Sequence, residues 1–257
     1  MTELTRVLEE ALRLEHSGER AALVTLIDTD GSTPRHGVAR MVVRADGSIV
    51  GTIGGGKVEH VMSRRALEVM GTGVAVLEER SLADIGMTCG GSVRVLVEPI
   101  GLRPRLAIFG AGHVGVEVAS LGARCDFIVQ VIDDRPDFAS SDRFPDAALL
   151  VHSFDPVEWG PLGLGPTSYC VVVTRGHAHD YHVVRALIDL DLAYLGMMGS
   201  AKKVAEVREK LARDGVAPEA IDRLHAPIGL SIGSETPAEI AVSVVGELIG
   251  VRMTGKP

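Results

Sequence analysis

The chain has 257 residues, of which 46% are hydrophobic and only 4% aromatic, and its formal net charge at pH 7 is −8. This charge argues against nucleic-acid binding, because such proteins present a basic surface to the phosphate backbone. No apolar run reaches the roughly 18 to 20 residues of a membrane-spanning helix, and the first twenty residues form an acidic amphipathic pattern rather than a signal peptide. Three cysteines without metal-like spacing argue against a disulfide framework, so we expect a cytoplasmic protein.

The first hundred residues differ in pattern from the rest, and we predict a small α+β domain over residues 1–100. Asp46-Gly47 is typical of a hairpin turn between two strands. Residues 99–104 contain a glycine and two prolines and are predicted to be a linker. The expected helices cover 1–20 and 57–70, and the expected strands cover 21–28, 39–44, 48–53, 74–80 and 92–98.

From residue 105 onward, strand and helix patterns alternate, as in a parallel sheet covered by helices. We therefore predict a Rossmann-like α/β domain over residues 105–257. Its last helix begins at Thr236-Pro-Ala-Glu239, a capping box with proline at the first helical position. The first expected strand begins at residue 105, and the others cover 127–132, 147–151, 169–174 and 192–197.

A glycine motif of the form G-x-G-x-x-G directly follows the strand that begins at residue 105. Gly110 would permit a tight turn, Gly112 would let the backbone approach a pyrophosphate, and Gly115 would let helix and strand pack closely. Phosphates would then meet free N–H groups at the helix start, next to His113. The alternative is a Rossmann domain that keeps its fold and binds nothing.

An acidic residue ends the next strand, about twenty residues beyond the glycines. Asp133 could accept a hydrogen bond from a ribose 2′-hydroxyl, which favours NAD over NADP. Arg135, two residues on, weakens that preference. Another ligand with a free ribose is the alternative to NAD at this site.

Polar residues crowd the loop after the strand at 169–174. Thr174, His177 and Asp180 would face the ligand crevice, because loops after the carboxyl ends of strands border it. With His179 and His182, these residues could bind a metal. Alternatively, Asp180 caps a helix and His177 contacts a ligand, and if a helix begins near His179, only some of these side chains can converge.

Two loops of the N-terminal half carry further candidates. Gly54, Gly55 and Gly56 precede an expected helix and could cradle an anionic group, although the P-loop spacing is absent. They could equally serve backbone geometry alone. The turn Ser32-Thr33-Pro34-Arg35 presents an arginine suited to a phosphate or carboxylate, and a solvated loop is equally consistent with it.

Cys89 lies beside two glycines in a loop that we expect to be accessible. Its thiolate could ligate a soft metal or carry sulfur. Cys125 and Cys170 stand in apolar surroundings and are expected to be core residues.

Taken in order, these segments resemble the xanthine dehydrogenase accessory factor family, XdhC/CoxI, over nearly the whole chain. In the first half the matching pieces are Gly31-Ser-Thr-Pro-Arg35, Gly51-Thr-Ile-Gly-Gly-Gly56 with Glu59, and Cys89-Gly-Gly91 running into Val97-Glu98-Pro99. In the second half they are Phe109-Gly-Ala-Gly-His-Val-Gly115, Val131-Ile-Asp-Asp-Arg135, Thr174 with His177 and Asp180, Leu195-Gly-Met-Met-Gly-Ser200, Pro227-Ile-Gly-Leu230 and Thr236-Pro-Ala-Glu-Ile-Ala241. His179 and His182 lie outside the family pattern, which weakens the case for a metal site.

The resemblance implies an accessory protein that binds molybdenum cofactor, supports its sulfuration and passes it to xanthine dehydrogenase or a related molybdenum hydroxylase. The glycine loops, Cys89 and the Rossmann crevice then become candidate contacts for the pterin, its phosphate or the metal. A sulfur-donating desulfurase and a second copy of the chain are further expected partners.

The competing hypothesis is an NAD-dependent oxidoreductase acting on a small molecule, which Asp133 and the glycine motif support equally. Such an enzyme needs a general acid or base in its substrate domain. The first hundred residues offer His16, His36 and His60, of which only His36 stands in a suitable loop. The Rossmann domain could also serve mainly for dimerisation.

Overall fold

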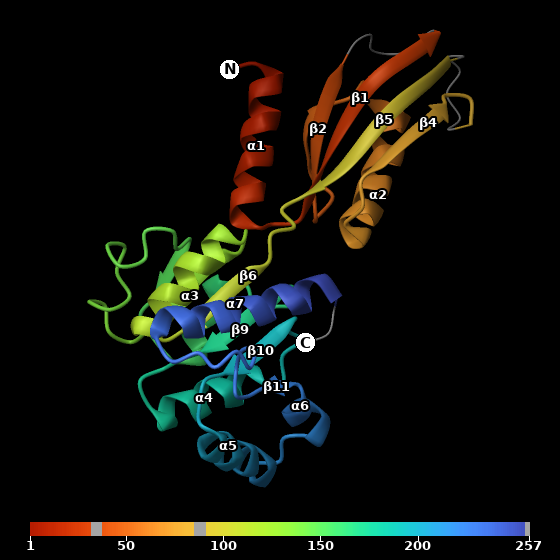
Figure 1. Ribbon diagram of the computed structural model, residues 1–257. Coiled ribbons are helices and arrows are strands. Elements are labelled where there is room, and N and C mark those ends of the chain that lie inside the picture. The colour runs from red at the N-terminus through yellow and green to blue at the C-terminus, as the bar shows by residue number, and fades with distance from the viewer. Residues whose placement is uncertain (32–37, 85–90, 255–257) are drawn as a thin grey trace. The chain divides into compact units, whose positions relative to one another are not determined.

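The computed structural model describes residues 1–31, 38–84 and 91–254, apart from the side chain of His177. It divides into two compact units, Met1–Arg103 and Pro104–Pro257. Each unit has its own sheet and its own hydrophobic clusters (Figure 1). The predicted fold class, a Rossmann-like parallel-sheet domain after a smaller α+β domain, is confirmed. Among the described residues, no helix has the length and apolarity required to cross a bilayer.

The N-terminal unit is built on an antiparallel sheet with the strand order β3-β2-β1-β5-β4. Its elements are α1 (Glu3–Ser17), β1 (Ala21–Gly31), β2 (Ala39–Arg44), β3 (Ile49–Thr52), α2 (Gly56–Thr72), β4 (Val76–Ser81) and β5 (Gly91–Ile100). Alternate residues of a strand point to opposite faces of the sheet. Ala22 and Val24 of β1 therefore pack in one cluster with α2, whereas Ala21 packs with Val7 and Leu14 of α1 in another. The two helices cover opposite faces.

The expected linker over residues 99–104 is wrong at its start. Pro99 and Ile100 still belong to β5, where they pair with Ala22 and Ala21 of β1. Strand β4 pairs with β5 only as far as Val97, so β5 is an edge beyond that point. A proline is tolerated there because no second neighbouring strand needs its missing N–H.

The C-terminal unit contains a six-stranded parallel sheet in the order β11-β10-β9-β6-β7-β8. Its strands are β6 (Arg105–Phe109), β7 (Ile128–Ile132), β8 (Leu149–Val151), β9 (Ser168–Val172), β10 (Tyr194–Met197) and β11 (Leu224–His225). Its helices are α3 (His113–Arg124), α4 (His177–Leu187), α5 (Ala201–Arg213), α6 (Pro218–Asp222) and α7 (Pro237–Thr254), with a 3₁₀ helix at Pro156–Leu162. Helices α5 and α6 and strand β11 lie outside the elements predicted above.

Helices cover both faces of this sheet. Leu106 and Ile108 of β6 pack in the cluster that contains residues of α3 and α7, and Ala107 and Phe109 pack in the cluster with α4, α5 and α6. Figure 1 shows α3 and α7 together and α4, α5 and α6 grouped separately. Strands buried on both faces read as continuous apolar runs, which is why the pattern predicted a parallel sheet.

The strand order reverses at β6, the first strand of the unit. From β6 the chain builds β7 and β8 on one side and later β9, β10 and β11 on the other. The loops after β6 and β9 therefore diverge at a topological switch point, where ligands bind in open α/β sheets.

The predicted capping box of α7 is also present, since Glu239 N–H donates to Thr236 Oγ1 (3.3 Å) and Thr236 N–H to Glu239 Oε2 (3.0 Å).

Candidate functional site

The three motif glycines after β6 differ in the space that surrounds them. A Cβ on Gly110, which has a φ of +124°, would lie 2.3 Å from the carbonyl oxygen of Val173, and one on Gly115 would lie 2.0 Å from that of Gly110. Both positions thus require glycine for the packing of the protein itself. A Cβ on Gly112 would meet nothing within 4 Å. Gly112 is therefore the glycine that leaves room for a ligand.

Helix α3 begins beside that open space without a side-chain cap. Its N-cap is Gly112, and no side chain bonds the N–H groups of its first turn in the described part of the chain. Helix α4 also begins at an uncapped glycine, Gly176. Uncapped helix starts leave N–H donors and the positive end of the helix dipole available to an anion. Both starts lie at the carboxyl edge of neighbouring strands, β6 and β9.

Asp133, the predicted ribose acceptor, is only 1% exposed and is bound within the protein. Its carboxylate accepts from the N–H groups of Ala111 (2.8 Å) and Arg135 (3.1 Å) and from Nε (2.7 Å) and Nη2 (2.8 Å) of Arg135. Burial raises the pKa of this carboxyl, but these hydrogen bonds outweigh it and hold the pKa below its ordinary value. Asp133 thus ties the glycine loop to the end of β7, and a ribose would have to displace Arg135.

Further arginines surround this edge of the sheet. Arg175, after β9, forms a bidentate ion pair with Asp134, after β7, and holds the pKa of that carboxyl below its ordinary value. Arg143 donates from Nη1 to the carbonyl of Ala111 (2.9 Å). The sequence interpretation assigned no role to Arg143, Arg175 or Asp134. This edge of the sheet is therefore rich in guanidinium groups.

Thr174 and Asp180, both predicted site residues, lie together and are buried. Thr174 Oγ1 donates to Asp180 Oδ1 (2.8 Å), and the ammonium of Lys203 forms an ion pair with Asp180 Oδ2. Lys203 also donates to the carbonyl of Met198 (3.0 Å). This connects the loops after β9 and β10.

Lys203 is a site residue that the sequence interpretation missed. It stands in the first turn of α5, where the helix dipole favours acidic residues. A basic residue in the first turn of a helix that closely follows the strand at 194–197 is the sequence feature that indicates this role.

The histidines of the loop after β9 do not form a metal centre in the described residues. His177 is the first residue of α4, so this helix begins earlier than His179, and the side chain of His177 lies outside the description. The ring of His179 lies 5.2 Å from that of Phe154, and His182 is exposed. Within the described ranges, no three His, Cys, Asp or Glu side chains are grouped so that they could hold a metal ion.

The glycine loop of the N-terminal unit is closed by its own helix. Glu59, in α2, accepts from the N–H groups of Ile53 (3.2 Å) and Gly55 (2.8 Å) and from the hydroxyl of Thr52. The cradle expected at Gly54, Gly55 and Gly56 thus holds the carboxylate of the protein itself. Ligand binding there remains a prediction that requires Glu59 to move.

Arg35 and Cys89, with the rest of their loops at 32–37 and 85–90, lie outside the described residues. Of the other cysteines, Cys125 is half-buried and Cys170 is buried. Burial raises the pKa of the Cys170 thiol well above its ordinary value, so this cysteine is unreactive.

Two hollows flank the start of α7 on the edge that carries the glycine loop. One, of about 360 Å³, is lined by His113, Arg143 and Thr236 among others. The other, of about 550 Å³, is lined by residues that include Ser200 and Lys203. The exposed imidazole of His113 and the ammonium of Lys203 therefore border spaces large enough for a small ligand.

Two segments of this chain match known protein families. Residues 106–248 match the XdhC Rossmann domain, and residues 14–79 match the XdhC and CoxI family. The chain belongs to the XdhC/CoxI family. The resemblance seen in the sequence motifs is confirmed.

Three relatives place the chain within the family. Uncharacterized protein YqeB of Escherichia coli (strain K12) is 38% identical over 96% of this chain and 46% of its own length. A probable xanthine dehydrogenase subunit from Bacillus subtilis (strain 168) is 36% identical over 63% of this chain and 47% of its own length. The molybdenum cofactor insertion chaperone PaoD of E. coli (strain K12) is 25% identical over 96% of this chain and 88% of its own length. The chain thus spans about half the length of the first two relatives.

A solved structure shares the fold. The crystal structure of a xanthine dehydrogenase from Bacillus halodurans aligns with a TM-score of 0.53 at 22% identity, over all of this chain and 97% of the other. At this identity the likeness supports the two-part architecture and nothing finer.

Proposed function

We propose that the protein is an accessory factor that binds molybdenum cofactor, supports its sulfuration and delivers it to a molybdenum hydroxylase of the xanthine dehydrogenase type. The observation that carries this proposal is the open, uncapped helix start at Gly112 within a fold of the XdhC/CoxI family. The alignment with PaoD over most of both chains supports a role in cofactor insertion.

The residues of the crevice fit the phosphate of a molybdopterin. The N–H groups at the starts of α3 and α4 would hold the phosphate oxygens. His113, Arg143 and Lys203 border the adjoining hollows and would orient the rest of the molecule. Cys89 is our candidate for the soft sulfur ligand that sulfuration calls for.

An NAD-dependent oxidoreductase is the less supported function. A dinucleotide with a free ribose needs an acceptor at the end of β7, and Asp133 there already accepts four hydrogen bonds from Ala111 and Arg135. A nucleotide could still enter as a secondary ligand. The client hydroxylase, a sulfur-donating desulfurase, a homodimeric state and a cytoplasmic location complete the proposal.

Titration with two ligands tests this function. Purified protein is titrated with molybdenum cofactor and separately with NAD, and binding is followed by calorimetry or fluorescence. The Gly112→Leu variant should fold, because its side chain enters open space, but should bind the cofactor at least about tenfold more weakly. Gly250→Leu is the matched control, since Gly250 lies in α7 and its Cβ would also meet nothing.

Each outcome is informative. Cofactor affinity lost in Gly112→Leu and kept in Gly250→Leu supports the crevice as the binding site. Equal affinity in both variants places the cofactor elsewhere. Tight NAD binding without cofactor binding contradicts the proposed function.

A further inference from the structure

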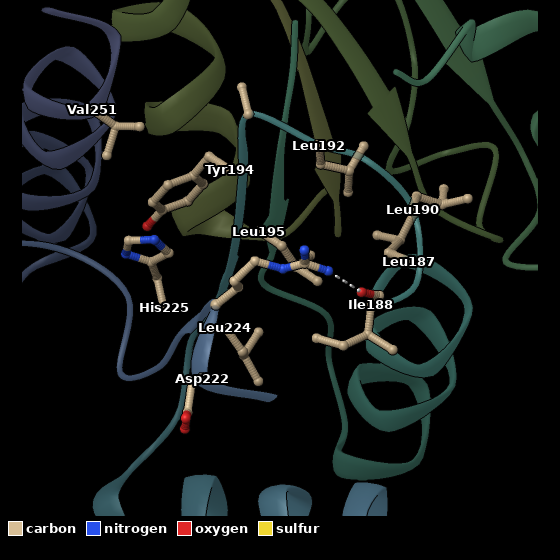
Figure 2. Close-up of a pocket in the computed structure, with 12 residues that line it drawn as sticks. Leu187, Ile188, Leu190, Leu192, Tyr194, Leu195, Asp222, Leu224, His225 and Val251 are labelled. Atoms are coloured by element: carbon tan, nitrogen blue, oxygen red, sulfur yellow. Dashed lines mark hydrogen bonds between the residues drawn. The ribbon is translucent and has the colours of Figure 1, made fainter. Parts of the chain in front are cut away.

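A separate hollow of about 390 Å³ lies near the amino end of strand β10, away from the carboxyl ends of the strands that border the site described above (Figure 2). Its lining includes Tyr194 and Leu195 at the beginning of β10, whereas the site described above contains Met198 and Lys203 beyond the end of that strand. The hollow also takes residues from the end of α4, from the segment 222–225 and from α7. The proposed cofactor site contains none of these lining residues.

Aliphatic side chains line one part of this hollow, and polar atoms contribute about as much of its surface as apolar ones. Figure 2 shows Leu187, Ile188, Leu190 and Leu192 gathered at the end of α4. The aliphatic lining residues are Leu187, Ile188, Leu190, Leu192, Leu195, Leu224 and Val251. A concave site of a few hundred Å³ with an apolar wall and a few polar groups is typical of small-molecule binding.

The lining contains one arginine, Arg223, whose side chain is exposed and makes little use of its donors within the described protein. Within the described chain, Arg223 makes a single hydrogen bond, from Nη2 to the carbonyl of Ile188 at 3.5 Å, the dashed line of Figure 2. A bond of that length lies at the limit of hydrogen bonding, and a guanidinium carries five N–H donors. Arg135 and Arg175, by contrast, are held in ion pairs with Asp133 and Asp134.

The backbone that carries Arg223 is held in place by a neighbour. Arg208 of α5 donates to the carbonyls of Ile221 (3.2 Å) and Leu224 (2.8 Å), on either side of Arg223. The guanidinium of Arg223 is therefore a donor on an anchored segment, beside an apolar wall.

Two acidic groups near the hollow, Glu247 and Asp222, are already engaged or directed elsewhere. Glu247 accepts from the hydroxyl of Tyr194 (2.5 Å), from Nδ1 of His225 (3.0 Å) and from the N–H of Gly229 (2.6 Å). Asp222 is 82% exposed and lies 3.9 Å from Arg208, and its side chain points away from the other lining residues in Figure 2. Asp222 is thus the acidic residue among those that line the hollow, and it does not face the aliphatic side chains.

We propose that this hollow binds a small amphipathic carboxylate, with its apolar body against the leucines and its carboxylate on the guanidinium of Arg223. The planar fork of arginine matches a carboxylate in a bidentate contact. A neutral apolar molecule would gain no ion pair from the exposed guanidinium, and inorganic phosphate would leave the aliphatic side chains in water. The ligand therefore needs both an acid group and a hydrocarbon body.

Octanoate is a suitable probe, with octanol and inorganic phosphate as comparisons. We expect saturable octanoate binding at one site per chain by calorimetry, and binding of octanol and of phosphate weaker by about tenfold or more. The Arg223→Gln variant should lose affinity for octanoate by a similar factor, and it should fold because Arg223 is exposed. Arg213→Gln is the control, since Arg213 is 69% exposed and lines none of the hollows described here.

A second variant tests the apolar wall. Leu192→Asp places a carboxylate on the half-buried wall and should abolish octanoate binding. The proposal is overturned if octanoate does not saturate, if Arg223→Gln binds it like the wild type, or if octanol binds equally well. Because the hollow lies outside the cofactor site, this result stands independently of the cofactor titration.

Discussion

Two glycine-rich loops within the described residues, at 51–56 in the N-terminal unit and at 110–115 in the C-terminal unit, resemble each other in composition and differ in what their N–H groups bind. In the N-terminal unit, Glu59 returns from α2 and its carboxylate accepts from Ile53 and Gly55. In the C-terminal unit, Ala111 is the residue of the glycine loop whose N–H donates to Asp133, and the start of α3 is left uncapped. One loop already contains an anion, and the other is open to one.

This difference shows that glycine content alone does not define an anion site. A loop can bind a ligand anion only if no carboxylate of the protein already fills the space. In this chain the position of the acidic residue determines whether the loop is already filled. Glu59 lies four residues from Gly55, whereas Asp133 follows a different strand.

The largest effect is expected at Gly115. A Cβ there would lie 2.0 Å from the backbone oxygen of Gly110, which cannot move without shifting β6, so Gly115→Ala should lose about 3 kcal/mol of unfolding free energy. Gly112→Ala, in the same loop, should lose no more than about 1 kcal/mol because its Cβ meets open space. Urea unfolding of both variants measures the difference, and equal losses would contradict the distinction between packing and open glycines.

The second effect concerns Asp133. Asp133→Asn weakens a buried set of charge-assisted hydrogen bonds and should cost about 2 kcal/mol near neutral pH. Because the pKa of Asp133 is lowered in the folded protein, its contribution is fully present above the ordinary aspartate pKa of about 4 and is lost as the pH falls through the lower folded value. The stability difference between wild type and variant should therefore shrink progressively as the pH falls below about 4. A difference that stays constant over this range would show that charge at Asp133 is not responsible.

Local patterns predicted much of the fold, because they depend on neighbours in the chain. The capping box at Thr236 and Glu239 and the tight packing at Gly115 both follow from residues a few positions apart. Contacts between distant segments were missed. The pairing of Lys203 with Asp180 depends on how β9 and β10 align, and the role of Asp133 depends on a loop more than twenty residues away.

The smallest effect is expected at Glu59, and it tests the closed loop directly. Glu59→Gln keeps the shape but loses the charge that strengthens the bonds to Ile53 and Gly55, so it should cost about 1 kcal/mol. Glu59→Ala removes the internal anion and should let sulfate bind the freed N–H groups. Sulfate stabilises many proteins by exclusion from their surface, so the control is Glu68→Ala in the same helix, whose carboxylate is 62% exposed. Sulfate should raise the melting temperature of Glu59→Ala more than that of Glu68→Ala or the wild type, and equal shifts would mean that the loop is no anion site even when Glu59 is absent.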